Sequence, residues 1–270
     1  MCYYNGQKVS HAEFIRLMNL EKEVAKYDFL NQGVQNAFNH GQIAVIVPTE
    51  DKTNFDIGQM EWGFIPAYIK NREQATNMRR GYKNSQGKYI PPYHMMNAIG
   101  KELLDPGKVW NVAAREHRCL ILSSGFYEYQ HVYRKNKKTG ADLKTPDTYP
   151  YHITVKESDY FYIAGVWQYW KDQTTGEVMP TVALVTTEAN GIMKQIHNSK
   201  NRMPTILPDD LAWEWLMGDL NDERIIELAT YQISSKEMEA CTVSKEFRDA
   251  LDPAVPFAYE GLAALDLSIE

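Results

Sequence analysis

The most constraining feature of this chain is a pair of short, apolar and aromatic-rich segments in its middle. Residues 118–122 and 126–130 have strand-like composition and are separated only by Ser123-Ser124-Gly125. Further segments typical of strands lie at residues 42–48, 59–66, 151–155, 160–167, 181–187 and 202–207. Many short strands with few helices between them predict an α+β fold. We expect a mostly antiparallel, strongly curved, barrel-like sheet flanked by helices.

The helices expected from the sequence are few. Residues 11–26 place Phe14, Leu17 and Val24 at helical spacing, with Ser10 as an N-cap, and predict a helix that covers the core. Other helices are expected at residues 72–79, 188–195 (capped by Thr187), 209–220 and 222–231.

No linker, repeat or low-complexity segment divides the chain. Residues 69–93 are polar and basic and are expected to form a long surface excursion. We therefore expect one domain over residues 1–270, with residues 220–270 as a helical or irregular extension.

The composition is that of an ordinary globular protein. Of the 270 residues, 44% are apolar and 24% are charged. No apolar run is long enough for a membrane span, and the first residues do not resemble a signal peptide. The three cysteines are far apart, which predicts a reducing cytoplasm and argues against a disulfide framework or zinc site. The usual motifs for nucleotide cofactors, zinc proteolysis and α/β-hydrolases are missing, so we expect no cofactor and no metal. We also expect no membrane partner and a monomer.

Charge is unevenly distributed along the chain. The net charge is −6, yet residues 70–140 contain 14 Lys/Arg against 5 Asp/Glu. A basic middle of this kind is consistent with a groove that follows the phosphates of a nucleic acid. It is equally consistent with solvated loops that carry scattered lysines.

Cys2 offers unusual chemistry. Aminopeptidases trim a methionine that precedes a small residue, and removing Met1 would leave an α-amine and a thiol on the same residue. Their unperturbed pKa values are ~7.7–8.0 and ~8.5, so both are partly nucleophilic at neutral pH. The pair can attack an ester or amide, or capture an aldehyde as an imine that the sulfur closes into a thiazolidine. The alternative is that cysteine stands at position 2 by chance.

Glu128 is the carboxylate that stands out. In an extended strand Phe126, Glu128 and Gln130 share one face, while Tyr127 and Tyr129 take the other. Aromatic surroundings favour the neutral acid and suit a carboxyl group for proton transfer. The same pattern also fits a solvent-facing glutamate on an edge strand.

Several separated segments occur in an order that identifies a family. They are Met1-Cys2, Trp62-Gly63-Phe64-Ile65-Pro66, Asn97-Ala98, Arg118-Cys119-Leu120-Ile121 running into Gly125-Phe126-Tyr127-Glu128-Tyr129, Thr186-Thr187-Glu188-Ala189-Asn190, and Ile196-His197 before Arg202-Met203-Pro204. This order resembles the SOS response-associated peptidase (SRAP) family from residue 2 to about residue 220. The resemblance implies a sensor of abasic sites in single-stranded DNA, whose N-terminal cysteine forms a thiazolidine cross-link with the ring-opened sugar.

The resemblance also implies roles for individual residues. Cys2 would be the nucleophile, and Asn97 would orient the N-terminus or the sugar. Glu128 would carry protons, and His197 would act as acid or base beside the sugar or its 3′ phosphate. Arg202 would contact a phosphate. The same cluster would remove the initiator methionine and reverse the cross-link.

The expected DNA contacts are less specific. Tyr3, Tyr4 and Tyr68 are candidates for stacking on bases, and the candidate phosphate contacts are Arg72, Arg79, Arg80 and Arg118. The chain departs from the family pattern at Tyr3-Tyr4, where the family has Gly and Arg, and at Ile99, where the family has Arg. It also carries additional residues at 198–201. These departures weaken the expectation of DNA contacts more than that of Cys2 chemistry.

Two other functions remain open from the sequence. One is a cysteine peptidase or amidase that uses the Cys2 thiol, His197 and Asn97 without DNA. The other is a non-catalytic single-strand binder. For the leading function we expect a cytoplasmic protein that associates with the nucleoid when it binds damaged DNA.

Overall fold

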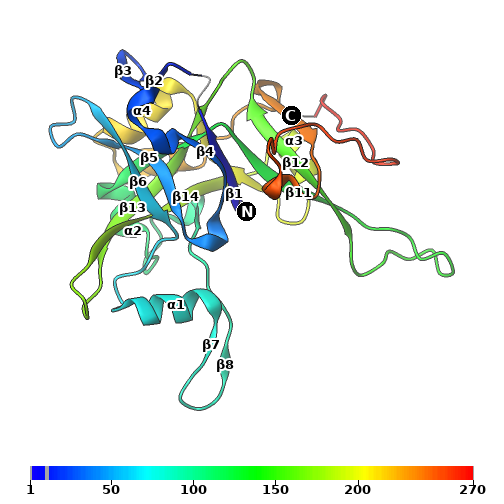
Figure 1. Ribbon diagram of the computed structural model, residues 1–270, viewed down its shortest axis with the longest axis horizontal. Coiled ribbons are helices and arrows are strands. Elements are labelled where there is room, and N and C mark those ends of the chain that lie inside the picture. The colour runs from blue at the N-terminus through cyan, green and yellow to red at the C-terminus, as the bar shows by residue number, and fades with distance from the viewer. Residues whose placement is uncertain (1, 10–11, 270) are drawn as a thin grey trace.

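Two β-sheets form the body of the protein in the computed structural model, which describes residues 2–9 and 12–269 (Figure 1). The first is five-stranded in the order β17-β12-β11-β1-β4, and its neighbouring strands pair antiparallel. Its strands are β1 (Tyr4–Lys8), β4 (Asn31–Asn36), β11 (Gly125–Val132), β12 (Asp147–Val155) and β17 (Met238–Thr242).

The second sheet closes on itself. Strands β14, β6, β5, β10 and β13 pair in that order, and β13 pairs again with β14, which makes a small barrel. Only β6 and β9 pair with β14 in parallel. The strands of this sheet are β5 (Gln42–Pro48), β6 (Phe55–Trp62), β9 (Asn97–Ile99), β10 (Arg118–Ser123), β13 (Phe161–Lys171), β14 (Val178–Glu188), β15 (Arg202–Pro204) and β16 (Ile206–Leu207). The predicted α+β fold with a mostly antiparallel, barrel-like sheet is confirmed.

The chain crosses from the barrel to the first sheet at Gly125. Strand β10 ends at Ser123 in the barrel, and β11 begins two residues later in the other sheet. Gly125 has φ +152°, and a Cβ there would lie 2.1 Å from Nε2 of His152. Only glycine fits this crossing, because any side chain would collide with the His152 ring.

The described residues form five short α-helices around the sheets: α1 (Arg72–Arg80), α2 (Asn111–Glu116), α3 (Gly191–Ile196), α4 (Asp209–Met217) and α5 (Asp222–Ala229). Helix α4 covers the barrel, where the buried Trp215 indole donates to the Cys119 carbonyl oxygen at 3.0 Å. None of the helices in the described ranges is long and apolar enough to cross a membrane.

The helix predicted over residues 11–26 is wrong. The described part of this segment forms a hairpin of β2 (Phe14–Leu17) and β3 (Leu20–Glu23), while Ser10 and His11 lie outside the described residues. Ile15 and Leu17 are buried and Arg16 is exposed, which is the period-two alternation of a strand. Met18 turns the chain with φ +53°.

The other predicted elements occur with shifted bounds. The predicted cap Thr187 stays in β14, where its hydroxyl donates to the Thr230 carbonyl oxygen. Asn190 caps α3 instead, because its side-chain oxygen accepts from the Met193 amide. The polar segment over residues 69–93 contains α1 and a second hairpin, β7 (Tyr82–Lys83) and β8 (Tyr89–Ile90).

Candidate functional site

Cys2 lies at the edge of a buried cluster between the two sheets. Strand β1 runs between β11 and β4, and the chain leads back from Tyr4 to Cys2. The Cys2 side chain packs in the cluster that also contains Trp62 and Met96, and its exposed fraction is 1%. Burial, together with the nearby charge of Glu128, raises the pKa of the thiol far above its ordinary value. The thiol therefore stays protonated at neutral pH unless a neighbouring base removes its proton.

Glu128 and His197 form a buried acid–base pair. Glu128 comes from β11, an inner strand of its sheet, and His197 follows directly after α3. Oε2 of Glu128 lies 3.9 Å from Nε2 of His197, and the two side chains are 7% and 5% exposed. The burial of Glu128 on an inner strand excludes the solvent-facing edge position that its sequence pattern allowed.

The hydrogen bond of Nδ1 sets the tautomer of His197. Nδ1 lies 2.7 Å from the Arg202 carbonyl oxygen, which can only accept a hydrogen bond. The neutral ring therefore carries its proton on Nδ1 and directs the lone pair of Nε2 towards Glu128. Burial lowers the pKa of His197, while Glu128 opposes that shift. A neutral imidazole in this position can accept a proton at physiological pH.

Asn97 contributes an amide that lacks partners. It lies opposite Leu184 in the parallel pairing of β9 with β14, and Leu184 packs in the cluster that contains Cys2. Its neighbour Ala98 packs in the other main cluster, so alternation turns Asn97 towards the Cys2 side. Asn97 is 9% exposed, and neither polar atom of its side chain forms a hydrogen bond. A buried, unpaired amide costs about 1–3 kcal/mol, which a ligand with a matching polar group would recover.

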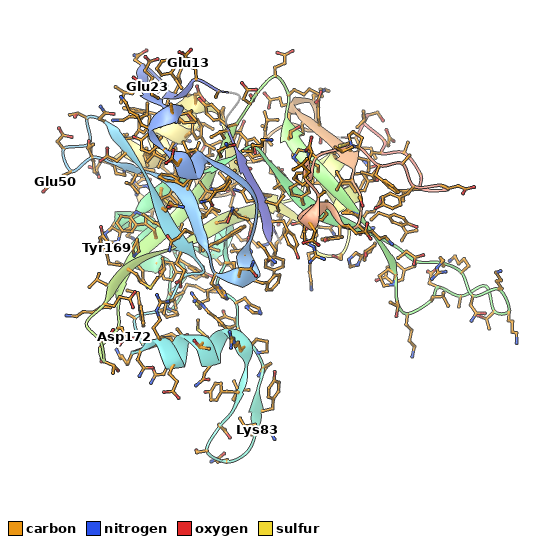
Figure 2. All side chains as sticks on the ribbon, in the orientation of Figure 1. Glu13, Glu23, Glu50, Lys83, Tyr169 and Asp172 are labelled. Carbon is orange, nitrogen blue, oxygen red and sulfur yellow. The ribbon has the colours of Figure 1, made fainter. Side chains whose placement is uncertain are left out.

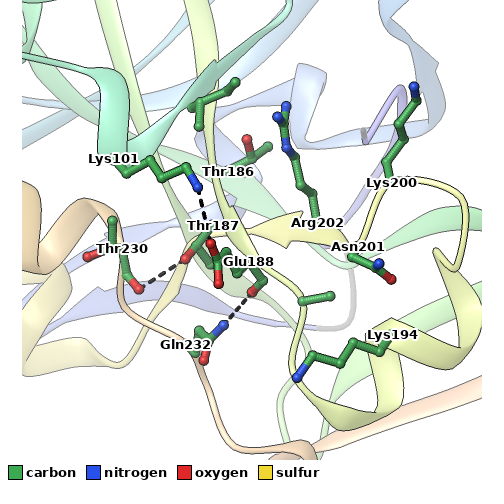
Figure 3. Close-up of a pocket in the computed structure, with 12 residues that line it drawn as sticks. Lys101, Thr186, Thr187, Glu188, Lys194, Lys200, Asn201, Arg202, Thr230 and Gln232 are labelled. Carbon is green, nitrogen blue, oxygen red and sulfur yellow. Dashed lines mark hydrogen bonds and ion pairs between the residues drawn. The ribbon is translucent and has the colours of Figure 1, made fainter. Parts of the chain in front are cut away.

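A cationic pocket of about 560 Å³ adjoins this cluster (Figure 3). Arg202, whose carbonyl oxygen binds His197, lines it, as does Ile99 on the Asn97 side of β9. The pocket is further lined by Lys101, Thr186, Thr187, Glu188, Ala189, Lys194, Lys200, Asn201, Thr230 and Gln232. Its four basic residues face one carboxylate, Glu188, which pairs with Lys101 at 3.2 Å.

Comparison with known proteins identifies the family of this chain. The family model described as SOS response associated peptidase (SRAP) matches residues 1–250. This chain belongs to the SRAP family.

Relatives in the SRAP family are named abasic site processing proteins. The abasic site processing protein YoqW of Bacillus subtilis is 28% identical over 200 residues, covering 74% of this chain and 75% of that one. The abasic site processing protein HMCES of Gallus gallus is 26% identical over 167 residues, covering 58% of this chain and 44% of its own length. A crystal structure of a protein from Bacteroides thetaiotaomicron superposes with a TM-score of 0.70 at 23% identity, covering 94% of this chain and 97% of that one, and shows the same fold.

Among the arginines predicted to contact DNA, three have structural partners in this SRAP chain. Arg72 and Arg79 both bind the carboxylate of Glu61, at 3.0 and 2.7 Å. Arg118 is 7% exposed, and its guanidinium donates to backbone carbonyl oxygens at the ends of α2 and α4, including that of Trp215 at 2.7 Å. The Arg118 guanidinium thus satisfies helix C-termini, and its burial corrects the prediction of a phosphate contact. Only Arg80 is exposed.

The tyrosines predicted to stack on bases differ in exposure. Tyr3 is partly buried against Phe38, with ring centroids 4.6 Å apart. Tyr4 packs edge-on against Phe247 on the face of the first sheet. Tyr68 is 59% exposed and has a ring open to solvent.

Sequence reasoning missed three basic residues of the pocket, Lys101, Lys194 and Lys200. Two signals could have found Lys101 and Lys200, whereas none pointed to Lys194. Lys101 follows Ile99, the position where the family has arginine, and Lys200 lies in the additional residues between His197 and Arg202. Within the described ranges, no group of three His, Cys, Asp or Glu side chains could hold a metal ion.

Proposed function

We propose that this protein captures abasic sites in single-stranded DNA as a covalent adduct of Cys2. The observation that carries the proposal is the buried Glu128–His197 pair, with 3.9 Å between its polar atoms, in the surroundings of a buried N-terminal thiol. The names of the relatives, abasic site processing proteins, supply the substrate class. Met1 lies outside the described residues, and its removal is part of the proposal.

The chemistry proceeds in two bond-forming steps. The Cys2 α-amine adds to the C1′ aldehyde carbon of the ring-opened sugar and gives a carbinolamine. A proton delivered to the carbinolamine hydroxyl group lets it leave as water, and an imine remains. Sγ then adds to the imine carbon, its proton passes by way of a base to the imine nitrogen, and the thiazolidine ring closes.

The site has a group suited to each proton movement. Glu128 delivers the proton that expels water. His197, neutral with its Nε2 lone pair available, assists the transfer of the thiol proton, which the raised pKa of Cys2 otherwise retains. The unpaired amide of Asn97 orients the hydroxyl or aldehyde oxygen of the sugar. The basic pocket receives an adjacent phosphate at Arg202, whose carbonyl oxygen binds His197, and at the neighbouring Lys200.

The same groups are proposed to process the N-terminus. Removal of Met1 converts an amide-linked Cys2 into the free amine that the capture reaction requires. Intact mass of the purified wild-type protein and of Glu128→Gln tests this step. We expect wild type to lack Met1 and the variant to retain part of it; complete removal in both would assign the step to cellular aminopeptidases.

A cross-linking assay tests the capture reaction. Protein shown by intact mass to begin at Cys2 is incubated with single-stranded DNA that carries one abasic site, and denaturing electrophoresis detects the adduct. We expect a shifted band that disappears with Cys2→Ala and with DNA whose abasic aldehyde has been reduced to the alcohol. A band that persists with either control, or no band with wild type, contradicts the proposal.

A peptide assay separates the capture function from a thiol peptidase. If the protein turns over peptides in the absence of DNA and forms no adduct, Cys2 and His197 serve amide hydrolysis instead. If it binds single strands equally well before and after Cys2→Ala, without any adduct, it is a binding module.

A further inference from the structure

A basic arm projects from the barrel beside the candidate site. We call residues 67–93 the arm; they leave the barrel after β6, form α1 and the β7–β8 hairpin, and extend away from both sheets at the bottom of Figure 1. The arm contains six Lys/Arg and a single acidic residue, Glu73. Its return segment runs through Tyr93 directly into β9, which begins at Asn97. The arm and the site are therefore joined by only a few residues.

The base of the arm is firmly attached. Arg72 and Arg79 bind Glu61 of β6, and the Arg72 amide donates to the Asp172 carboxylate at 2.9 Å. The Trp170 indole donates to the Ile69 carbonyl oxygen at 2.7 Å. Two of the six basic residues thus hold the arm to the barrel, and Lys70 donates to the Ala67 carbonyl oxygen at 2.8 Å.

The outer part of the arm presents cations beside open rings. Arg80, Lys83 and Lys88 are exposed, and none of them has an ion pair with a described residue. Lys83 stands directly opposite Tyr89 in the β7–β8 hairpin, which puts a cation and a ring on one face. Four tyrosines are largely exposed: Tyr68 (59%), Tyr82 (40%), Tyr89 (56%) and Tyr93 (57%).

The hairpin is fixed relative to α1. Gly81 joins them with φ +76°, and a Cβ at that position would lie 2.6 Å from the Tyr89 hydroxyl oxygen and 2.9 Å from the Ile90 carbonyl oxygen. The Tyr93 amide donates to the Met78 carbonyl oxygen of α1 at 2.7 Å. These contacts pack the hairpin against the end of the helix, so its rings and cations keep their relative positions.

We propose that the arm binds the single-stranded DNA that flanks the abasic site, its tyrosines stacking on bases and its basic side chains contacting phosphates. Exposed rings interleaved with unpaired cations match a single strand, in which the faces of the bases are accessible and every nucleotide carries a negative charge. The role of the flanking strand rests on the proposed capture function, whereas the binding itself does not require a lesion.

Two arm variants and one control test this surface. The variants are Tyr82→Ser with Tyr89→Ser, and Lys83→Glu with Lys88→Glu. The control, Lys26→Glu with Lys52→Glu, makes the same charge change on two exposed residues, one shortly after β3 and one between β5 and β6. Glu23 and Glu50, which lie near them in sequence, are far from Lys83 in Figure 2. Equal thermal unfolding midpoints establish that all of the variants are folded.

The first measurement is the affinity for a fluorescent, lesion-free single strand of about 20 nucleotides at several salt concentrations. We expect each arm variant to bind roughly tenfold more weakly than wild type, while the control binds as wild type does. The lysine variant should also reduce the slope of log K against log salt by at least about 1.4, because each lost phosphate contact removes about 0.7. Wild-type affinity and slope in both arm variants would overturn the proposal.

The second measurement is the rate of cross-linking to an abasic oligonucleotide of about five nucleotides, compared with one of about 20. If the arm holds flanking DNA, its variants slow the reaction of the long strand and leave the short one unchanged. Failure of wild type to cross-link either strand would contradict the capture function and leave the lesion-free binding result standing. Equal slowing of both strands would place the arm inside the catalytic site and overturn its role as a flanking contact.

Discussion

Two buried polar clusters of this molecule, the anchoring cluster around Glu61 and the candidate site around Glu128, differ in how their polar groups are paired. In the anchoring cluster, both carboxylate oxygens of Glu61 bind arginine, with distances of 2.7 Å to Arg79 and 3.0 Å to Arg72. In the candidate site, Glu128 and His197 are 3.9 Å apart, and the side-chain amide of Asn97 has no hydrogen-bond partner among the described residues. Tight pairing of charges stabilises the attachment of the arm. The unpaired amide of Asn97, by contrast, is left available to bind a ligand.

Breaking the anchoring cluster should have the largest effect on stability. Glu61→Gln leaves Arg79, whose side chain is 10% exposed, without an opposite charge, and we expect the free energy of unfolding to fall by about 3–5 kcal/mol. Urea denaturation measures this change. The matched control is Glu21→Gln, which breaks an exposed pair with Arg16 at 3.3 Å and should cost less than about 1 kcal/mol. Similar losses in the two variants would contradict the structural role assigned to Glu61.

The corresponding substitution in the site should separate stability from activity. Asn97→Leu replaces an unpaired buried amide by an apolar group of similar size, so we expect the free energy of unfolding to stay unchanged or rise by about 1 kcal/mol. The rate of cross-linking to abasic DNA should fall by roughly 10²-fold, because the sugar loses its orienting group. Denaturation and cross-linking are measured on the same preparation. A loss of stability comparable to that of Glu61→Gln would make Asn97 a structural residue.

The sequence predicted some secondary-structure elements well and missed others. Strand β10 was predicted within a residue of its end, because apolar residues run through its whole length. Helix α1 was predicted over residues 72–79 and spans Arg72–Arg80, with Asn71 as its N-cap and Gly81 as its C-cap. The hairpin β2–β3 was missed because Phe14, Leu17 and Val24 fit a helical period, whereas the strand alternation rests on the burial of Ile15 and Leu17 alone. The pairing of neighbouring strands decided between the two periods, and local sequence does not contain that information.

Site residues posed a harder problem than strands. Glu128 and His197 are 69 residues apart in sequence, and the resemblance to a family named them where no local pattern could. The same sequence reasoning treated Arg72, Arg79 and Arg118 as available cations. Their partners, Glu61 and the carbonyl oxygens of α2 and α4, come from other elements, so only the fold reveals that these charges are already compensated.

Low pH should lower the stability that the anchoring cluster contributes. His40 lies next to Arg79, and burial together with that positive charge lowers its pKa from 6.5 to about 4. Between these two values the unfolded chain takes up a proton at His40 that the folded protein excludes, so stability is fully present above pH 6.5 and is lost as the pH falls towards 4. We expect this term to be on the order of 1–2 kcal/mol after allowance for the partial exposure of the ring.

Denaturation of wild type and His40→Gln at pH 7 and pH 5 isolates this term, since the carboxylates titrate alike in both proteins. The difference in free energy of unfolding between the two pH values should be smaller in His40→Gln. Identical pH dependence would show that His40 does not sense the anchoring cluster.

We expect the smallest effects at two exposed ion pairs on the protein surface. Lys101 pairs with Glu188 at 3.2 Å in the basic pocket, and Lys26 pairs with Glu23 at the same distance far from it. Because both pairs are largely exposed, Lys101→Met and Lys26→Met should each change the free energy of unfolding by less than about 1 kcal/mol. Lys101→Met should nevertheless weaken binding to single-stranded DNA about threefold at low salt, with the difference vanishing at high salt as screening removes the phosphate contact. The two lysines each pair with a glutamate at the same distance, so a loss of binding confined to Lys101→Met would reflect the position of Lys101 in the pocket. Equal binding by both variants would show that Lys101 does not contact a phosphate.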